Sequence, residues 1–157
     1  MGQELHRTAN GTAPSRSFFA IMCAGACVAS ASRRQTAIAL STAEAEIYAL
    51  CACVRLLLVL RRIAAFVLGY TLPPSVVYED NTAVISMLKR RDLTARTRHI
   101  RVNLGFIVDA IDAREIEIHY VGTADQVADV GTNQRDVETF VRHRNLLLGI
   151  IGMASHT

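Results

Sequence analysis

Residues 40–50, LSTAEAEIYAL, place Glu44 and Glu46 at the start of a strongly apolar stretch of the chain. Ser41 or Thr42 can cap a helix that begins directly after them, and acidic side chains are favourable in a first turn because the helix dipole is positive there. The two glutamates therefore either stabilise a helix or serve the chemistry of a site, and residues elsewhere in the chain decide between these alternatives.

We expect this helix to be long and to extend from Ala43 to Leu68. Gly69 follows it, and the Pro73–Pro74 pair prevents any further continuation. The apolar residues within the segment recur at the spacing of one helix face, which predicts that this face packs against a core. They are Ile47, Leu50, Val54, Leu57, Leu58, Ala65 and Leu68.

The helical spacing also separates the two glutamates. At about 100° per residue, Glu46 lies beside Leu57 and Ala64 at the edge of the apolar face. Glu44 instead falls on the side of the two arginines at positions 55 and 62. We therefore expect Glu46 to face inward and Glu44 to face solvent.

The remaining segments alternate between strand and helix patterns. SFFAIMCAG and ACVASAS are short apolar stretches broken at Gly25, which predicts a strand pair. SVVYEDN predicts a strand, TAVISMLKR a short helix, HIRVNLGFIVDAIDA a further helix and the alternating EIEIHYV a half-buried strand. ADQVADVG and DVETFVRHRNLLLGI predict helix. This order indicates a single α/β domain with mixed strand pairing.

The composition is apolar, but it does not predict a membrane span. Hydrophobic residues make up 51% of the 157 residues. Arginines nevertheless interrupt the most apolar segment, residues 47–70, and leave no uncharged run of about 18 residues there. The N-terminal residues match neither a signal peptide nor a myristoylation signal, which predicts an intracellular protein without a membrane partner. The net charge of +3 is compatible with nucleic acid binding.

The four cysteines do not form a metal-binding pattern. Cys23 and Cys27 lie in a run of small apolar residues, and Cys51 and Cys53 are two apart on the long helix, where they face different sides. No further Cys or His completes a set at ligand spacing. We expect all four to be buried as small hydrophobic residues.

Three acidic residues lie at the ends of predicted elements. Asp80 ends the strand SVVYED, Asp129 lies early in a helix, after Asp125, and Glu46 lies near the start of the long helix. Ligands gather at the carboxyl ends of strands in open α/β sheets. Carboxylate oxygens are the donors that Mg²⁺ requires, and two such ions can activate water and stabilise a leaving oxygen in phosphodiester cleavage. The alternative is that these acids are helix caps or solvated residues.

The sequence contains four blocks that are informative together, namely ALSTAEAEIYAL, VVYEDNTAVISMLKR, RTRHIRVNLGFIVDAIDAREIEIHYVGTADQVADV and the closing LLLGI. In order and with matching gaps, they resemble the ribonuclease H domain of copia-type LTR retrotransposon polyproteins. The resemblance implies a ribonuclease H-like domain over residues 16–149, with unstructured tails at residues 1–15 and 150–157. It implies an α/β fold with a five-stranded mixed sheet flanked by helices.

The resemblance also implies an activity, which is two-metal hydrolysis of the RNA strand of RNA/DNA hybrids. It assigns Glu46, Asp80 and Asp129 as catalytic residues and as ligands of Mg²⁺ or Mn²⁺, and it makes Glu44 a neighbour that does not coordinate. The family has a fourth acid on its first, central strand, and that position falls near Gln3 or Glu4, outside any strand-like run. We therefore expect the first strand to be missing, the sheet to be incomplete and catalysis to be impaired.

Basic residues supply the candidate nucleic-acid contacts. One group surrounds the segment between the two predicted middle helices, and a pair ends the predicted hairpin. These residues either contact phosphates or form solvated charged surface. They are Arg33, Arg34, Lys89, Arg90, Arg91, Arg96, Arg98, His99 and Arg101.

Two functions follow as alternatives. One is a retroelement-derived ribonuclease H module that acts on RNA/DNA hybrids, with the reverse transcriptase part of a polyprotein as a possible partner. The other is a catalytically inactive remnant of the fold that binds nucleic acid weakly or has no function. In both cases we expect Glu46, Asp80 and Asp129 to lie close together, and we expect no turnover from the isolated chain.

Overall fold

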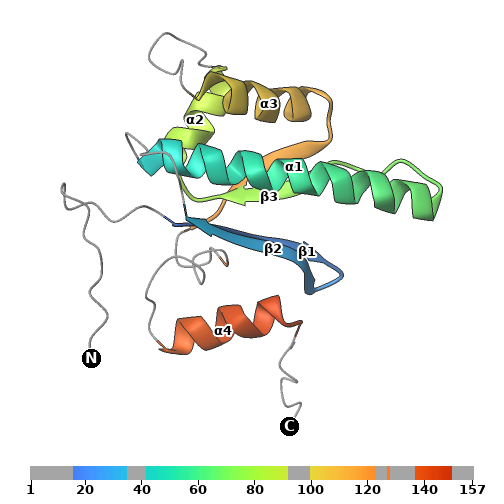
Figure 1. Ribbon diagram of the computed structural model, residues 1–157, viewed down its shortest axis with the longest axis vertical. Helices are drawn as coiled ribbons and strands as arrows, with labels where there is room; N and C mark the ends of the chain where they lie inside the picture. The colour runs from blue at the N-terminus through green and yellow to red at the C-terminus, as the bar shows by residue number, and fades with distance from the viewer. Residues whose placement is uncertain (1–15, 35–41, 92–99, 123–126, 128–136, 150–157) are drawn as a thin grey trace.

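A computed structural model of the chain describes residues 16–34, 42–91, 100–122, 127 and 137–149 (Figure 1). The fold is mixed α/β, as expected from the alternating strand and helix patterns. The elements are β1 (Arg16–Cys23), β2 (Ala26–Arg34), α1 (Thr42–Leu68), β3 (Ser75–Glu79), α2 (Thr82–Arg90), α3 (Arg101–Asp112), β4 (Ile116–Tyr120) and α4 (Val137–Leu147). Each of these eight was expected from its sequence pattern, and the segment ADQVADVG lies almost wholly outside the described residues.

The strands β1 and β2 form an antiparallel hairpin. Its tight turn places Ala24 and Gly25 at φ angles of 50° and 82°. Glycine adopts this left-handed conformation without steric cost, which explains why the apolar run breaks there. The expectation that all four cysteines are buried is wrong for Cys23, which is exposed because it lies at the turn, away from the core, and it holds only in part for the half-buried Cys27 and Cys53. Cys51 is buried, with its thiol 3.4 Å from Asn103 Oδ1.

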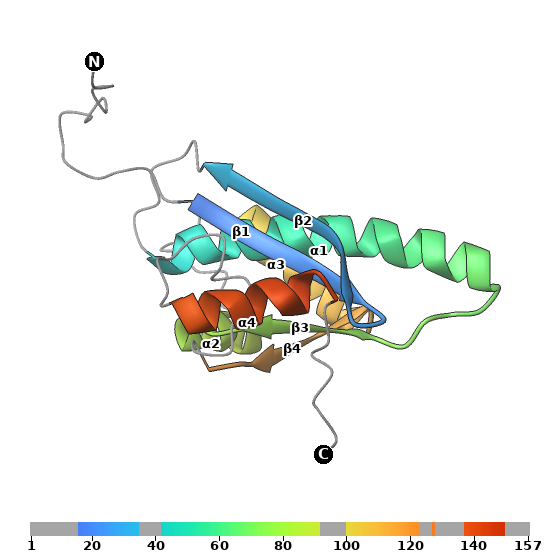
Figure 2. The ribbon, with the colours of Figure 1, turned by 90° about the horizontal axis from the view of Figure 1, so that it is seen from below.

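The four described strands form two separate sheets of two strands each. β3 and β4 are parallel, and their register pairs Ser75 with Ile116 and Glu79 with Tyr120. α1 covers one face of the β1–β2 hairpin, and α4 lies on the opposite face (Figures 1 and 2). β1, not β2, is the hairpin strand on the side of β3 (Figure 2). Within the described part of the chain no strand joins β1 to β3.

The core lies between α1, α2, α3 and the β3–β4 pair. Val54, Leu104 and Ile107 are completely buried at its centre. On α1, the residues of this core run from Ile47 to Val54, with Leu57 and Leu58 partly buried against it. Leu68, which was expected to continue the apolar face of the helix, is exposed because α1 extends beyond the other elements (Figure 1). Among the described helices none is long and apolar enough to cross a membrane.

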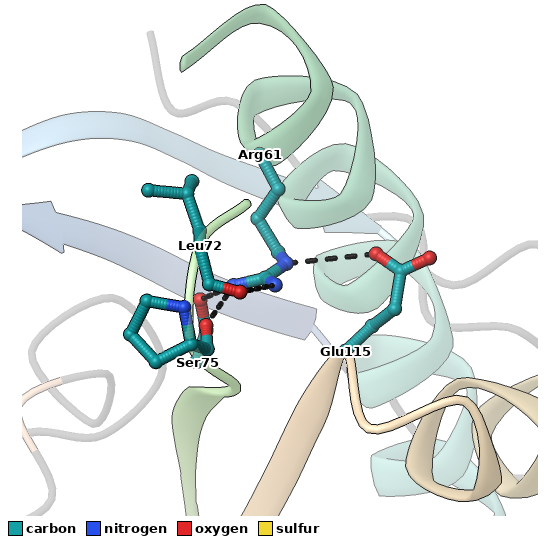
Figure 3. A network of polar contacts seen from close by, with 5 residues as sticks. Arg61, Leu72, Ser75 and Glu115 are labelled. Atoms are coloured by element: carbon teal, nitrogen blue, oxygen red, sulfur yellow. Dashed lines mark hydrogen bonds and ion pairs between the residues drawn. The ribbon is translucent and has the colours of Figure 1, made fainter. Parts of the chain in front are cut away.

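Arg61 ties α1 to two other parts of the fold (Figure 3). Its guanidinium donates hydrogen bonds to the carbonyl oxygen of Pro73 and the hydroxyl of Ser75, both at 2.7 Å, and to the carbonyl oxygen of Leu72 at 3.2 Å. Its Nε lies 3.6 Å from a carboxylate oxygen of Glu115, just before β4. The largely buried side chain of Arg61 thus joins the last third of α1 to the approach to β3 and to the start of β4.

Candidate acidic site

The candidate acids lie where three elements meet at one end of the molecule. The amino end of α1, the carboxyl end of β3 and the start of α2 all point to this end in both ribbon views (Figures 1 and 2). α1 supplies Glu46 near its start, and β3 leads directly into Asp80. The carboxyl end of β2, which carries Arg33 and Arg34, points the same way.

Glu79, the last residue of β3, is a buried acid that the sequence interpretation passed over. Side chains on β3 alternate, so that Val77 and Glu79 face the core while Val76 and Tyr78 face outward. Only 7% of Glu79 is exposed. The alternation within SVVYED could have predicted that Glu79 is buried, because a residue two positions after a buried valine lies on the same face of the strand.

The pKa of Glu79 depends on two other acids that lie nearby. The pKa of its carboxyl group is raised from 4.5 to about 7, chiefly by burial and in smaller part by the negative charges of Glu46 and Asp80. Hydrogen bonds from the backbone amides of Asn81 and Asp80 act in the opposite direction and do not cancel the burial. Glu46 and Asp80, from different elements, therefore both lie within electrostatic reach of one buried carboxyl group.

Asn81 fixes the backbone that carries these acids. Its side-chain oxygen accepts hydrogen bonds from the amides of Ala83 and Val84, at 2.8 and 3.3 Å, and so caps α2. Its own amide donates to Glu79 Oε1 at 3.0 Å. The short DN sequence thus ends β3, begins α2 and holds Glu79 in place.

The expected orientation of the two glutamates in α1 is wrong for Glu44. Only 8% of Glu44 is exposed, whereas Glu46 is half-buried. The buried face of α1 runs through Ile47, Cys51 and Val54. Glu44 precedes Cys51 by seven residues, close to two full turns, so it lies above the same face.

The donors at this end suit a hard divalent cation but form an incomplete set. Glu46 and Asp80 present carboxylate oxygens, the ligands that Mg²⁺ and Mn²⁺ prefer, and a bound cation would offset the negative charge that both place near Glu79. Asp129, the third predicted ligand, lies outside the described residues. Within the described ranges no group of three or more His, Cys, Asp or Glu side chains is arranged to hold a metal ion.

The predicted nucleic-acid contacts are placed only in part. Lys89 and Arg101 are exposed on either side of residues 92–99, and Arg91 forms an ion pair of 2.5 Å with Asp112. Arg33 and Arg34 are placed by their backbone in β2, while Arg96, Arg98 and His99 lie outside the described residues.

Comparisons with known proteins do not assign a family. No protein-family model matches the chain. No solved structure matches it significantly.

Proposed function

We propose that the chain is a ribonuclease H-like domain of retroelement origin that binds RNA/DNA hybrids at its acidic end. One observation carries the proposal, namely that Glu46 from α1 and Asp80 from the end of β3 both act on the buried carboxyl group of Glu79. The four sequence blocks that resemble copia-type domains assign the metal-binding acids to the same two positions. The bound ion, Mg²⁺ or Mn²⁺, would supply activation of water and stabilisation of the leaving oxygen.

The arrangement of the strands supports this proposal. In ribonuclease H domains the first strand lies between the hairpin and the strand that ends in a metal-binding aspartate. The described protein has the β1–β2 hairpin on one side of that position and the β3–β4 pair on the other. In the family the central strand also carries the first acid, so its absence from the described fold agrees with an incomplete carboxylate set.

The basic residues extend the site along a direction that suits a nucleic acid strand. α2 begins at the acids and spans nine residues to Lys89 and Arg90. Its length of roughly 13 Å corresponds to about four phosphate spacings of 3.4 Å along the axis of a duplex. A strand whose scissile phosphate lies at Asp80 could therefore meet the cations at the end of α2 and at Arg101 through phosphates a few nucleotides away.

A catalytically inactive remnant of the same fold is the second candidate. Within the described residues, the missing three-residue metal group favours it. Both candidate functions predict binding to RNA/DNA hybrids, but only the ribonuclease H-like domain predicts cleavage of the RNA strand.

We expect the isolated chain to bind a labelled RNA/DNA hybrid in a metal-dependent manner and to show no turnover above background with Mg²⁺ or Mn²⁺. Binding is measured by fluorescence anisotropy and cleavage by gel electrophoresis. The variants D80N and E46Q should weaken the metal-dependent part of binding by tenfold or more, because changing even a residue that only orients a metal ligand costs about ten- to hundredfold in affinity.

The matched control is D109N, which removes an exposed acid from α3. It should bind like the parent chain. Equal affinity for hybrid and for double-stranded DNA, or binding that D80N and E46Q leave unchanged, would contradict the proposed function. Robust hybrid cleavage that D80N abolishes would show that the carboxylate set is sufficient and would eliminate the inactive remnant.

A further inference from the structure

The last turns of α1 carry an apolar surface that is open to solvent. Val59 and Ile63 are 51% and 55% exposed, and Phe66 and Val67 are 88% and 74% exposed. The end of α1 extends beyond the other elements of the fold (Figures 1 and 2). This surface is far from the acidic site, which lies at the other end of the same helix.

These four residues form one face and are called the α1 stripe below. Their positions follow the spacing i, i+4, i+7 and i+8, which is the pattern of a helix face that packs against another element. Isolated exposed apolar residues are common on proteins, but a contiguous patch marks an interaction surface. The stripe therefore predicts a docking surface, with Phe66 as its most exposed anchor.

The charges beside the stripe are of one sign. Arg62 is exposed and lies three residues from Val59 and four from Phe66, which places it next to the stripe. Arg61 points away into its network with Pro73, Ser75 and Glu115. The sequence contains no acidic residue between Glu46 and Glu79. An occupant that carries acidic groups beside an apolar face is therefore the complementary one.

A second copy of the chain fits this surface less well. Antiparallel pairing of two stripes would bring the two Arg62 side chains together without an acid to compensate them, and like charges at an interface oppose association. An anionic lipid surface is also a poorer match, because membrane-surface helices carry several basic residues on their polar face. Here Arg62 is the one exposed cation in the last three turns of α1.

We propose that the α1 stripe docks an amphipathic helix of another polypeptide, one that carries Glu or Asp beside its apolar face. Phe66 and Ile63 insert among the apolar residues of that helix, and Arg62 pairs with its acidic flank. This mode of recognition uses the i, i+4 and i+7 anchors of one helix against another. It requires neither the acidic site nor nucleic acid.

The test uses two synthetic helical peptides with identical leucine faces, one flanked by glutamates and the other by lysines. Binding to the full chain is measured by fluorescence anisotropy. We expect the acidic peptide to bind about fivefold or more tightly than the basic one, which corresponds to one exposed charge pair of about 1 kcal/mol. The variant F66D should weaken binding at least tenfold, because an aromatic anchor carries much of the binding energy of such an interface.

Two further variants make the result decisive. R62E should reverse the preference between the peptides, and V102D should change nothing, since Val102 is an equally exposed apolar residue on α3. The thermal unfolding of each variant is recorded to confirm that it is folded. Equal binding of both peptides, or binding that F66D leaves intact, would overturn the proposal. So would a stripe-dependent dimer in sedimentation, or tighter binding to anionic phospholipid vesicles than to the acidic peptide.

Discussion

The free energy of unfolding of the chain should fall as the pH rises from 5 to 8, and the variant E79Q should remove most of this decrease. Glu79 is 7% exposed, and its pKa is raised from 4.5 to about 7. A shift of this size corresponds to about 3 kcal/mol between the protonated and ionised forms. E79Q is expected to be more stable than the parent chain at pH 8 by about 2 to 3 kcal/mol.

The direction of this pH dependence follows from which state of the chain, folded or unfolded, keeps the Glu79 proton. Below pH 4.5 both the folded and the unfolded chain keep the Glu79 proton, so the group favours neither state. Between pH 4.5 and 7 the unfolded chain releases the proton and the folded chain retains it, so stability falls with rising pH. Above pH 7 the folded chain carries a buried carboxylate beside Glu46 and Asp80, and the loss is complete.

Urea unfolding at a series of pH values measures this effect. The matched control is E117Q on the neighbouring strand β4, where the glutamate side chain is exposed. E117Q should keep the pH dependence of the parent chain. A parent chain whose stability is flat or rises from pH 5 to 8, or an E79Q variant with an unchanged slope, would show that Glu79 is ionised in the folded state.

The second large effect is expected at Arg61. Replacing it by methionine keeps most of the aliphatic stem but removes three hydrogen bonds and the ion pair with Glu115. The Arg61 side chain is 10% exposed. Hydrogen bonds to a charged group contribute about 1.5 to 3 kcal/mol to stability, whereas the Glu115 carboxylate is 35% exposed and water can solvate it, so the ion pair adds little. R61M should therefore lower the free energy of unfolding by about 2 kcal/mol.

Two further variants test whether stability depends on the hydrogen-bonding geometry of the Arg61 guanidinium or only on its positive charge. R62M removes the neighbouring exposed arginine and should change stability by less than about 0.5 kcal/mol. R61K keeps the charge but not the planar fork that reaches Pro73, Ser75 and Glu115, so it should recover little of the loss. Equal stability of R61M and R62M in urea unfolding would contradict the role of Arg61 as the link between α1, β3 and β4.

The elements of the fold were largely predictable because their signals are local. The helix expected from Ala43 to Leu68 is confirmed, since its spacing, the first-turn acid Glu44 and the following Gly69 all act within a few residues. The hairpin and the strand Ser75–Glu79 are confirmed for the same reason. The separation of the strands into two sheets depends on pairing between distant segments, which periodicity alone does not encode.

The candidate site was predicted less completely, for two physical reasons. Glu44 was misplaced because the apolar edge was taken at Leu57, which is only half-buried, whereas the buried face runs through Cys51. Glu79 was not predicted because Asp80, the next residue, ends the strand and matches the pattern of a ligand site, although alternation places Glu79 inward with Val77. The partners of Arg61 lie 11 to 54 residues away, so no local pattern could reveal them.

The most direct test is whether a divalent cation binds between Glu46 and Asp80. Substoichiometric Mn²⁺ added to the isotopically labelled chain broadens the NMR signals of amides near the bound ion. We expect selective broadening at Glu46, Asp80 and Asn81, with the signal of Val67 at the other end of α1 unaffected. We expect E46Q and D80N each to weaken the broadening and their combination to abolish it. Broadening centred elsewhere, or broadening that survives the double variant, would contradict a metal site at this end of the fold.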